Sequence, residues 1–70
     1  MKIKDYIINN FKEDDVNTLR NTITECIQDD DEETLPGMGV FLELIWKGST
    51  EEQRKEMLEV LNNELKKWLF

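Results

Sequence analysis

The sequence predicts a small all-α protein: a bundle of three to four helices in a single domain over residues 1–70, with the helix Pro36–Lys47 at its centre. Along most of the chain, apolar residues recur at intervals of three and four, which is the spacing of one helix face. The chain has one cysteine and no histidine, so an intrachain disulfide cannot form and the common zinc ligand sets are missing. Helix packing, with or without self-association, is what remains to stabilise so short a chain.

The first helix is predicted over Ile3–Phe11. Ile3, Ile7 and Phe11 recur every four residues, so they share one face of a helix. A helix of this length is marginal on its own. We therefore expect it to be held by packing against the rest of the chain.

The second helix is predicted over Asp15–Gln28, with Asp14 as its N-cap. Its apolar residues fall on a single face: Val16, Leu19, Ile23, Cys26 and Ile27. We expect Cys26 to be a small buried residue of that face, because free cysteine is among the most buried residue types.

An acidic run, Asp29–Glu33, follows the second helix. Like charges in a row repel one another, so we predict a solvated loop that ends at Thr34-Leu35-Pro36. The run lacks the glycine and the glutamate that a calcium-binding EF-hand loop requires. Two alternatives stay open: the loop is disordered, or it binds a divalent cation weakly.

The third helix is predicted to begin at Pro36, since proline suits the first helical turn, and to end at Gly48. It is apolar over most of its circumference, through Met38, Val40, Phe41, Leu42, Leu44, Ile45 and Trp46. Its polar arc consists of Gly39, Glu43 and Lys47. Such a helix is buried on more than one side, so it is either the centre of the fold or the place where a partner binds. We expect Glu43 to lie on the exposed arc and pair with Lys47; the alternative is a buried carboxyl with a raised pKa.

The fourth helix is predicted to start with a capping box over Ser49–Glu52, in which the Ser49 hydroxyl accepts a hydrogen bond from the N–H of Glu52. Apolar residues follow at helical spacing: Met57, Leu58, Leu61, Leu65, Trp68 and Leu69. Lys66 and Lys67 suit the negative end of the helix dipole.

The sequence offers no candidate catalytic, cofactor-binding or metal-binding residue, and we expect a non-enzymatic protein. Without histidine the chain lacks the commonest general base and the Ser/His and Cys/His pairs. Gly37-Met38-Gly39 is similar to the opening of a dinucleotide-binding fingerprint, but Leu42 stands in place of the third glycine and no βαβ unit surrounds it. We therefore expect no cofactor.

Large aromatic and apolar side chains are the candidate interaction residues. Trp46 borders the polar arc of the third helix, and Trp68 lies in an apolar tail. Tryptophan is usually a core residue, yet it is also enriched at binding hot spots. The candidate set is Phe41, Trp46, Trp68, Leu69 and Phe70.

The formal net charge of −7 bears on the partners of the chain. Nucleic-acid binding depends on Lys and Arg that neutralise phosphates, so this class of partner is disfavoured. The strongly apolar stretch Met38–Trp46 is shorter than the roughly 20 residues of a membrane-spanning helix, and polar residues interrupt the N-terminal segment where a signal peptide would be apolar. We expect no membrane association, and a single cysteine fits a reducing compartment such as the cytoplasm.

The segment Thr34-Leu35-Pro36-Gly37-Met38-Gly39-Val40-Phe41-Leu42-Glu43-Leu44-Ile45-Trp46-Lys47 resembles the core of the minor small acid-soluble spore proteins of type I from endospore-forming bacteria. The resemblance extends over about Leu19–Lys67 and does not include the first fifteen residues. Two features depart from the family pattern: the run Asp29-Asp30-Asp31 is more acidic, and the tail Trp68-Leu69-Phe70 is additional.

The resemblance implies a protein that is made in the developing forespore and kept in the spore core. It implies no catalytic residue. The expected function is that of a structural or interaction protein in sporulation or germination, acting as a homodimer or with another spore-core protein. A nucleic-acid-associated spore protein is the alternative, although the sequence has none of the pattern of the DNA-coating spore proteins and its charge opposes this function.

Overall fold

The computed structural model describes residues 2–29 and 32–68, which form four α-helices and one short 3₁₀-helix. These are α1 (Ile3–Phe11), α2 (Val16–Asp29), the 3₁₀-helix η1 (Glu32–Thr34), α3 (Leu35–Gly48) and α4 (Glu51–Lys66). No strand occurs in the described part of the chain, so the predicted all-α class is confirmed.

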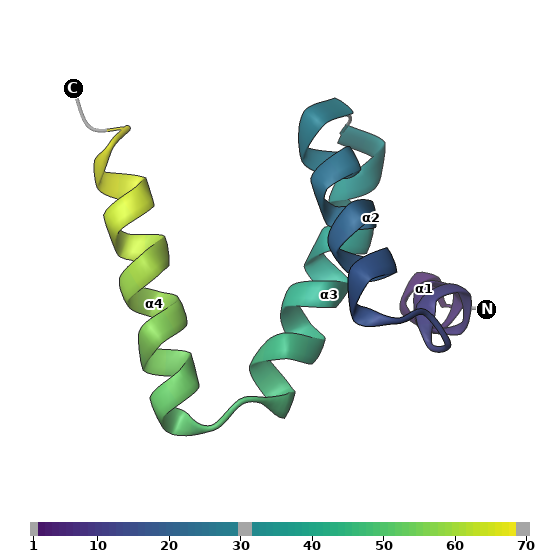
Figure 1. The fold of residues 1–70 in the computed structure, drawn as a ribbon, viewed down its shortest axis with the longest axis horizontal. Helices are drawn as coiled ribbons and strands as arrows, with labels where there is room; N and C mark the ends of the chain where they lie inside the picture. The colour runs from purple at the N-terminus through teal and green to yellow at the C-terminus, as the bar shows by residue number, and fades with distance from the viewer. Residues whose placement is uncertain (1, 30–31, 69–70) are drawn as a thin grey trace.

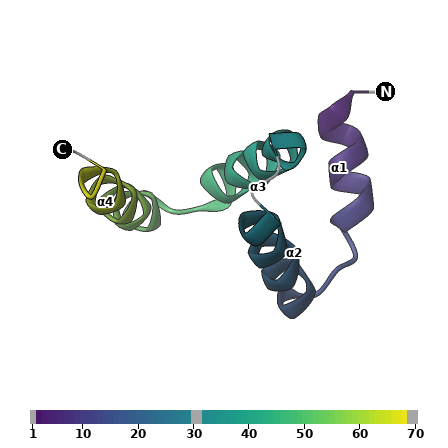
Figure 2. The same ribbon diagram turned by 90° about the horizontal axis from the view of Figure 1, so that it is seen from above.

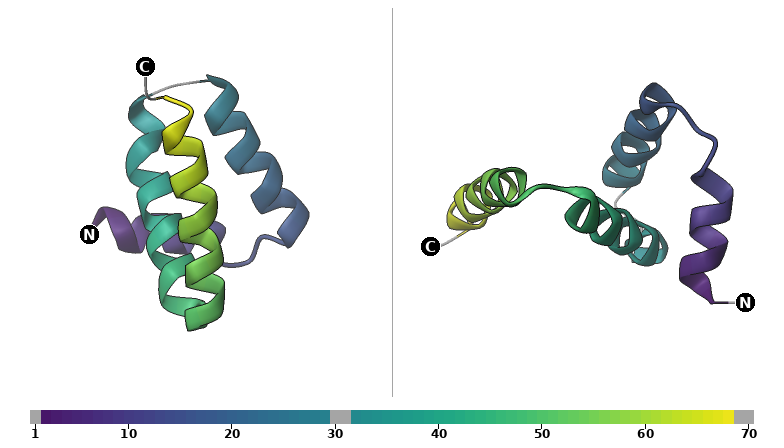
Figure 3. Two further views of the ribbon diagram at one scale, coloured as in Figure 1. Left: turned by 90° about the vertical axis from the view of Figure 1, so that its left-hand side faces the viewer. Right: turned by 90° about the horizontal axis from the view of Figure 1, so that it is seen from below.

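The third helix is the centre of the arrangement, as the sequence predicts. In Figure 1, α3 lies between the pair α1 and α2 on one side and α4 on the other. Helices α3 and α4 diverge from a short link and form an open V (Figure 1). Seen from above, α4 stands apart from the cluster of the other three helices (Figure 2), and the view from below shows the same order of α4, α3, α2 and α1 (Figure 3, right).

The main contact between α-helices joins α1 to α3. Ile7 is the only buried residue among those described, with 8% of its surface exposed. It lies over Gly37, where an added Cβ would sit 3.9 Å from the Ile7 Cδ1 atom. The rings of Phe11 and Phe41 meet edge to face, with centroids 5.2 Å apart, a favourable aromatic geometry. Ile7 and Phe11, two of the three residues that the spacing places on one face of α1, thus contact α3, whereas Ile3 is exposed.

Helix α2 begins at Val16, one residue later than predicted. The Thr18 N–H donates to Asp15 Oδ1 at 2.8 Å, so Asp15 is the N-cap and the prediction of Asp14 is wrong. The Asp14 N–H donates instead to the Phe11 carbonyl oxygen and closes the turn after α1. Within α2, Thr22 and Thr24 donate their hydroxyls to backbone carbonyls one turn back, which satisfies these poor helix formers locally.

The acidic run is more ordered at both ends than a loop. Asp29 is the last residue of α2, and Glu32–Thr34 forms η1 against α3. Leu35 then opens α3, which places Pro36 within the first turn, where its missing N–H costs no helical hydrogen bond. The prediction of a loop from Asp29 to Pro36 is therefore wrong at these residues; Asp30 and Asp31 lie outside the described residues.

The cap of α4 lies one residue further along the chain than predicted. The Gln53 N–H donates to Thr50 Oγ1 at 3.1 Å, and the Thr50 N–H donates to Gln53 Oε1 at 2.9 Å. This reciprocal pair is a capping box, so the prediction of Ser49 and Glu52 is wrong. The Ser49 hydroxyl instead donates to the Ile45 carbonyl oxygen at the end of α3.

The fold is open for a chain of this size. Its accessible surface is 6372 Å², about 1,800 Å² more than the roughly 4,600 Å² expected of a compact protein of 8.4 kDa. The radius of gyration is 13.7 Å, whereas a compact domain of this length has about 11 Å. Hollows lie between α1, α2 and α3 and between α3 and α4, and these places are the candidate functional sites.

Candidate functional site

Titratable side chains are not gathered into a chemical centre in the described part of the chain. Residues 2–29 and 32–68 contain no group of three Asp, Glu, Cys or His that could hold a metal ion. No helix of the described chain has the length and apolarity needed to span a membrane. Cys26 is a half-buried free thiol on α2 rather than the fully buried residue we predict from the sequence.

Glu43 is a carboxylate with two lysine partners. Its Oε2 atom lies 3.0 Å from Lys4 Nζ, and its Oε1 atom lies 3.4 Å from Lys47 Nζ. The side chain is half exposed and pairs with Lys47 one turn away, so the prediction of an exposed-arc residue with this partner is confirmed. Hydrogen bonds from Lys4 and Lys47 hold the pKa of Glu43 below its ordinary value of 4.5, opposite in direction to the alternative of a raised pKa.

The ion pair of Glu43 also ties two helices together, because Lys4 belongs to α1 and Glu43 to α3. The pairing raises the pKa of Lys4 above its ordinary value, chiefly through the hydrogen bond to Glu43. Both groups are solvated, so the pair contributes little to stability on its own. It is one of the contacts that link α1 to α3.

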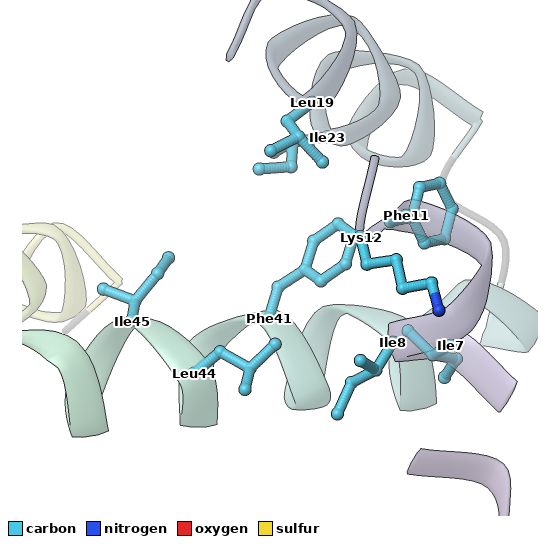
Figure 4. A pocket seen from close by; sticks show the side chains of 9 residues that line it. All are labelled: Ile7, Ile8, Phe11, Lys12, Leu19, Ile23, Phe41, Leu44 and Ile45. Atoms are coloured by element: carbon cyan, nitrogen blue, oxygen red, sulfur yellow. The ribbon is translucent and has the colours of Figure 1, made fainter. Parts of the chain in front are cut away.

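An apolar hollow of about 340 Å³ lies between α1, α2 and α3. In Figure 4, Leu19 and Ile23 of α2 point toward Phe41 of α3, and Lys12 lies at the edge beside Ile8. The hollow is lined by Ile7, Ile8, Phe11, Lys12, Leu19, Ile23, Phe41, Leu44 and Ile45. All of these residues except Lys12 are apolar, and α2 covers them only in part.

A second apolar surface is the groove between α3 and α4, with a volume of about 480 Å³. We define it by its lining residues: Gly39, Leu42, Glu43, Trp46, Met57, Leu58 and Leu61. Leu42 and Leu61 are 60% and 52% exposed. Large apolar side chains that face each other across an open groove are typical of a surface that binds another helix.

Arg54 braces the closed end of this groove. Its Nε atom donates to the Trp46 carbonyl oxygen at 2.8 Å, which satisfies an orphan carbonyl at the end of α3. Its guanidinium carbon lies 5.3 Å from the centroid of a Trp46 ring, a cation–π geometry. Its Nη1 atom also pairs with Glu51 at 2.9 Å. These contacts set the angle between α3 and α4.

The predicted interaction residues fall into three groups. Trp46 lines the α3–α4 groove, and Trp68 lies just beyond α4 with 75% of its surface exposed. Phe41 faces α1 and is half-buried against Phe11. Leu69 and Phe70 lie outside the described residues.

Sequence reasoning missed the aliphatic residues that make up most of the groove. The helical spacing of Leu42 on the third helix and of Met57, Leu58 and Leu61 on the fourth was visible. It indicated an apolar face without indicating that the face is open. Arg54 carried no signal, because its contact with Trp46 exists only once the two helices meet at the link.

Comparison with known proteins gives one consistent result. The family model of small, acid-soluble spore protein I matches residues 1–65. Proteins of that description from Bacillus cereus (strain AH187) and Bacillus anthracis (strain CDC 684 / NRRL 3495) are each 49% identical over 49 residues, which cover 70% of this chain and 71% of theirs. No solved structure matches significantly. The family match includes the first fifteen residues, which the predicted resemblance left out, and it ends before Lys66.

Proposed function

This chain belongs to the small, acid-soluble spore protein I family, and we propose that it acts in the spore core as a non-enzymatic structural or interaction protein during sporulation or germination. One observation carries the proposal. Apolar residues of α3 and α4 line an open groove between the two helices, which diverge from their link (Figure 1), and this groove supports the proposal of a binding surface.

The contacts and pKa shifts of two carboxylates support a structural role. Glu43 has its two oxygens engaged by Lys4 and Lys47 in the α1–α3 contact. Asp15 caps α2, and the backbone N–H of Thr18 holds its pKa below the ordinary value. General acid–base catalysis at neutral pH favours a carboxyl group with a raised pKa, whereas both of these groups are shifted in the opposite direction.

The groove supports an interaction role on energetic grounds. Burial of apolar surface stabilises a complex by about 25 cal/mol for each Å² removed from water. Leu42, Leu58 and Leu61 are all exposed along the groove. A surface of this kind gains more from a protein partner than from water, so we expect it to be covered when the protein works.

A role in nucleic-acid binding is the alternative that the charge disfavours. The chain has nine basic against sixteen acidic residues, and Glu43, Glu51 and Glu64 each take up a lysine or arginine in an ion pair. Titration of a labelled DNA duplex at low salt tests this alternative, because low salt favours phosphate contacts most. We expect no complex at tens of micromolar protein.

The proposed function is tested by complementation in a spore-forming strain that lacks the gene. We expect wild-type protein to restore germination and outgrowth, and Leu61→Asp to fail. Asn63→Asp is the matched control, because it adds the same charge to an exposed position of α4 outside the groove. The proposal is overturned if Leu61→Asp restores function as well as Asn63→Asp does.

A further inference from the structure

We propose that the α3–α4 groove is filled by the α4 helix of a second copy of this chain, so that two open helix pairs interlock into a four-helix unit. The proposal rests on the function proposed above and names the partner. Its support comes from the spacing of the groove residues, the size of the surplus surface and the braced link.

The exposed apolar residues of α3 and α4 form two rows with the spacing of a coiled-coil seam. On α3, Leu35, Gly39, Leu42 and Trp46 follow at intervals of four, three and four; on α4, Leu58, Leu61 and Leu65 follow at three and four, and Trp68 lies three residues further on, just beyond the helix. Every residue of both rows is exposed. Alternation of three and four is the pattern that packs side chains of one helix into the spaces of another.

The surplus surface has the size of a homodimer interface. If two copies each reached the surface of a compact protein, they would bury roughly 3,500 Å² in total, within the range of about 2,000–5,000 Å² for obligate homodimers. Part of the surplus belongs to the hollow under α2. A standard stable interface needs only about 1,600 Å², less than half of this total.

The braced link opposes closure of the groove within one chain. Arg54 joins α4 to the last turn of α3 through the Trp46 carbonyl and ring. The two linking residues are also committed, because Ser49 donates its backbone N–H to the Trp46 carbonyl at 3.3 Å and Thr50 caps α4. Folding α4 onto α3 in the same chain would disturb the Arg54 contacts, which join the two helices, whereas a helix from a second copy enters without disturbing them.

No contact within a single chain explains why residue 39 is a glycine. A Cβ placed there meets no atom within 4 Å, and glycine inside a helix is less favourable than alanine. Its lack of a side chain leaves a notch in the α3 row between Leu35 and Leu42. A neighbouring helix can approach α3 closely at such a notch.

The self-complementary chemistry of the chain selects a second copy over an unrelated protein. The α4 helix continues its apolar row past the groove to Leu65, and Trp68 follows just beyond the helix end. Helix α4 therefore forms one wall of its own groove and can also fill the groove of a second copy. A twofold dimer uses the same surface on both partners. Exchange of α4 ridges therefore covers both rows of both copies at once.

The test combines molar mass with site-directed cross-linking of the full chain. We expect sedimentation equilibrium to give a dimer at about 10 μM protein, since an interface of this size supports micromolar or tighter binding. We expect Gly39→Ala to weaken the dimer about tenfold or more by filling the notch. A monomer at all concentrations up to about 100 μM, or an unchanged dimer in Gly39→Ala, overturns the proposal.

Cross-linking locates the interface without disrupting it. In a Cys26→Ser background, Leu61→Cys places the sole thiol at the middle of the α4 row, next to its own counterpart in a twofold dimer. We expect it to form an interchain disulfide about tenfold faster than Glu56→Cys on the opposite face, because the bond needs Cβ atoms about 4 Å apart. Equal rates at the two positions overturn the proposed geometry.

The outcomes separate this proposal from the function on which it rests. A monomeric wild type, together with a Leu61→Asp variant that fails in spores, rejects the second copy and keeps an interaction role with a different protein. A Leu61→Asp variant that restores spore function rejects the interaction role of the groove, whatever the mass of the wild type.

Discussion

Truncation of Ile7 is the substitution with the largest expected effect on stability. Ile7 is 8% exposed and lies between α1 and Gly37 of α3. Ile7→Ala removes three carbon atoms from this contact, worth about 2.4 kcal/mol at roughly 0.8 kcal/mol for each buried methylene. The cavity term should be small, because the site borders the hollow under α2 and can relax into it.

The matched control is Ile3→Ala, the same substitution on the same helix. Ile3 is 65% exposed, so its truncation should cost about a third as much, roughly 0.8 kcal/mol. The free energy of unfolding is measured by urea denaturation at one protein concentration, followed by circular dichroism. A domain of this size has about 4–10 kcal/mol in total, so the Ile7 variant should be visibly destabilised. An Ile7→Ala cost no larger than that of Ile3→Ala would refute the assignment of the α1–α3 contact.

Three further predictions concern single polar contacts. Because Lys4 and Lys47 lower the pKa of Glu43, its ionised form adds stability above pH 4.5, and this stability is lost as the pH falls through the lowered pKa. Urea denaturation should show that wild type loses more stability on acidification than Glu43→Gln does. Equal losses in the two proteins would contradict this prediction. Thr50→Ala should cost about 1 kcal/mol in the same assay as the N-cap of α4, whereas Ser49→Ala should cost less than about 0.5 kcal/mol; the reverse order would restore the sequence-based cap. Arg54→Lys should reduce stability by about 0.5–1 kcal/mol and shift Trp46 fluorescence, since lysine cannot reproduce the stacked guanidinium, and an unchanged emission spectrum would argue against the brace.

Local sequence patterns predict the helices but leave the first residue of a helix undecided. Asp14 and Asp15 are equally good caps by residue type. Ser49 and Thr50 are both common caps, and each is followed three residues later by Glu52 or Gln53, as a capping box requires. The cap is the residue that the preceding turn leaves free. The backbone N–H of Asp14 bonds to Phe11 in the turn after α1, and the Ser49 hydroxyl bonds to Ile45 at the end of α3.

One part of the candidate site could likewise be predicted from the sequence, and another part could not. The apolar rows of α3 and α4 could be predicted from spacing, and Trp46 was singled out because it borders the polar arc. The sequence left two possibilities for a helix apolar on most sides: burial within the fold, or contact with a partner. The structure shows α1 on one side of α3 and an open groove on another, which favours the second possibility.

The sequence by itself determined the all-α class, the order of four helices and the spore-protein family, because helical periodicity and a long family segment are properties of residues near one another in the chain. Only the tertiary structure decided that Lys4 pairs with Glu43, that Ile7 lies over Gly37, and that Arg54 holds α4 away from α3. These contacts join residues on different helices, so they depend on crossing angles. Crossing angles follow from how side chains fit together in space, and periodicity along a single helix does not contain them.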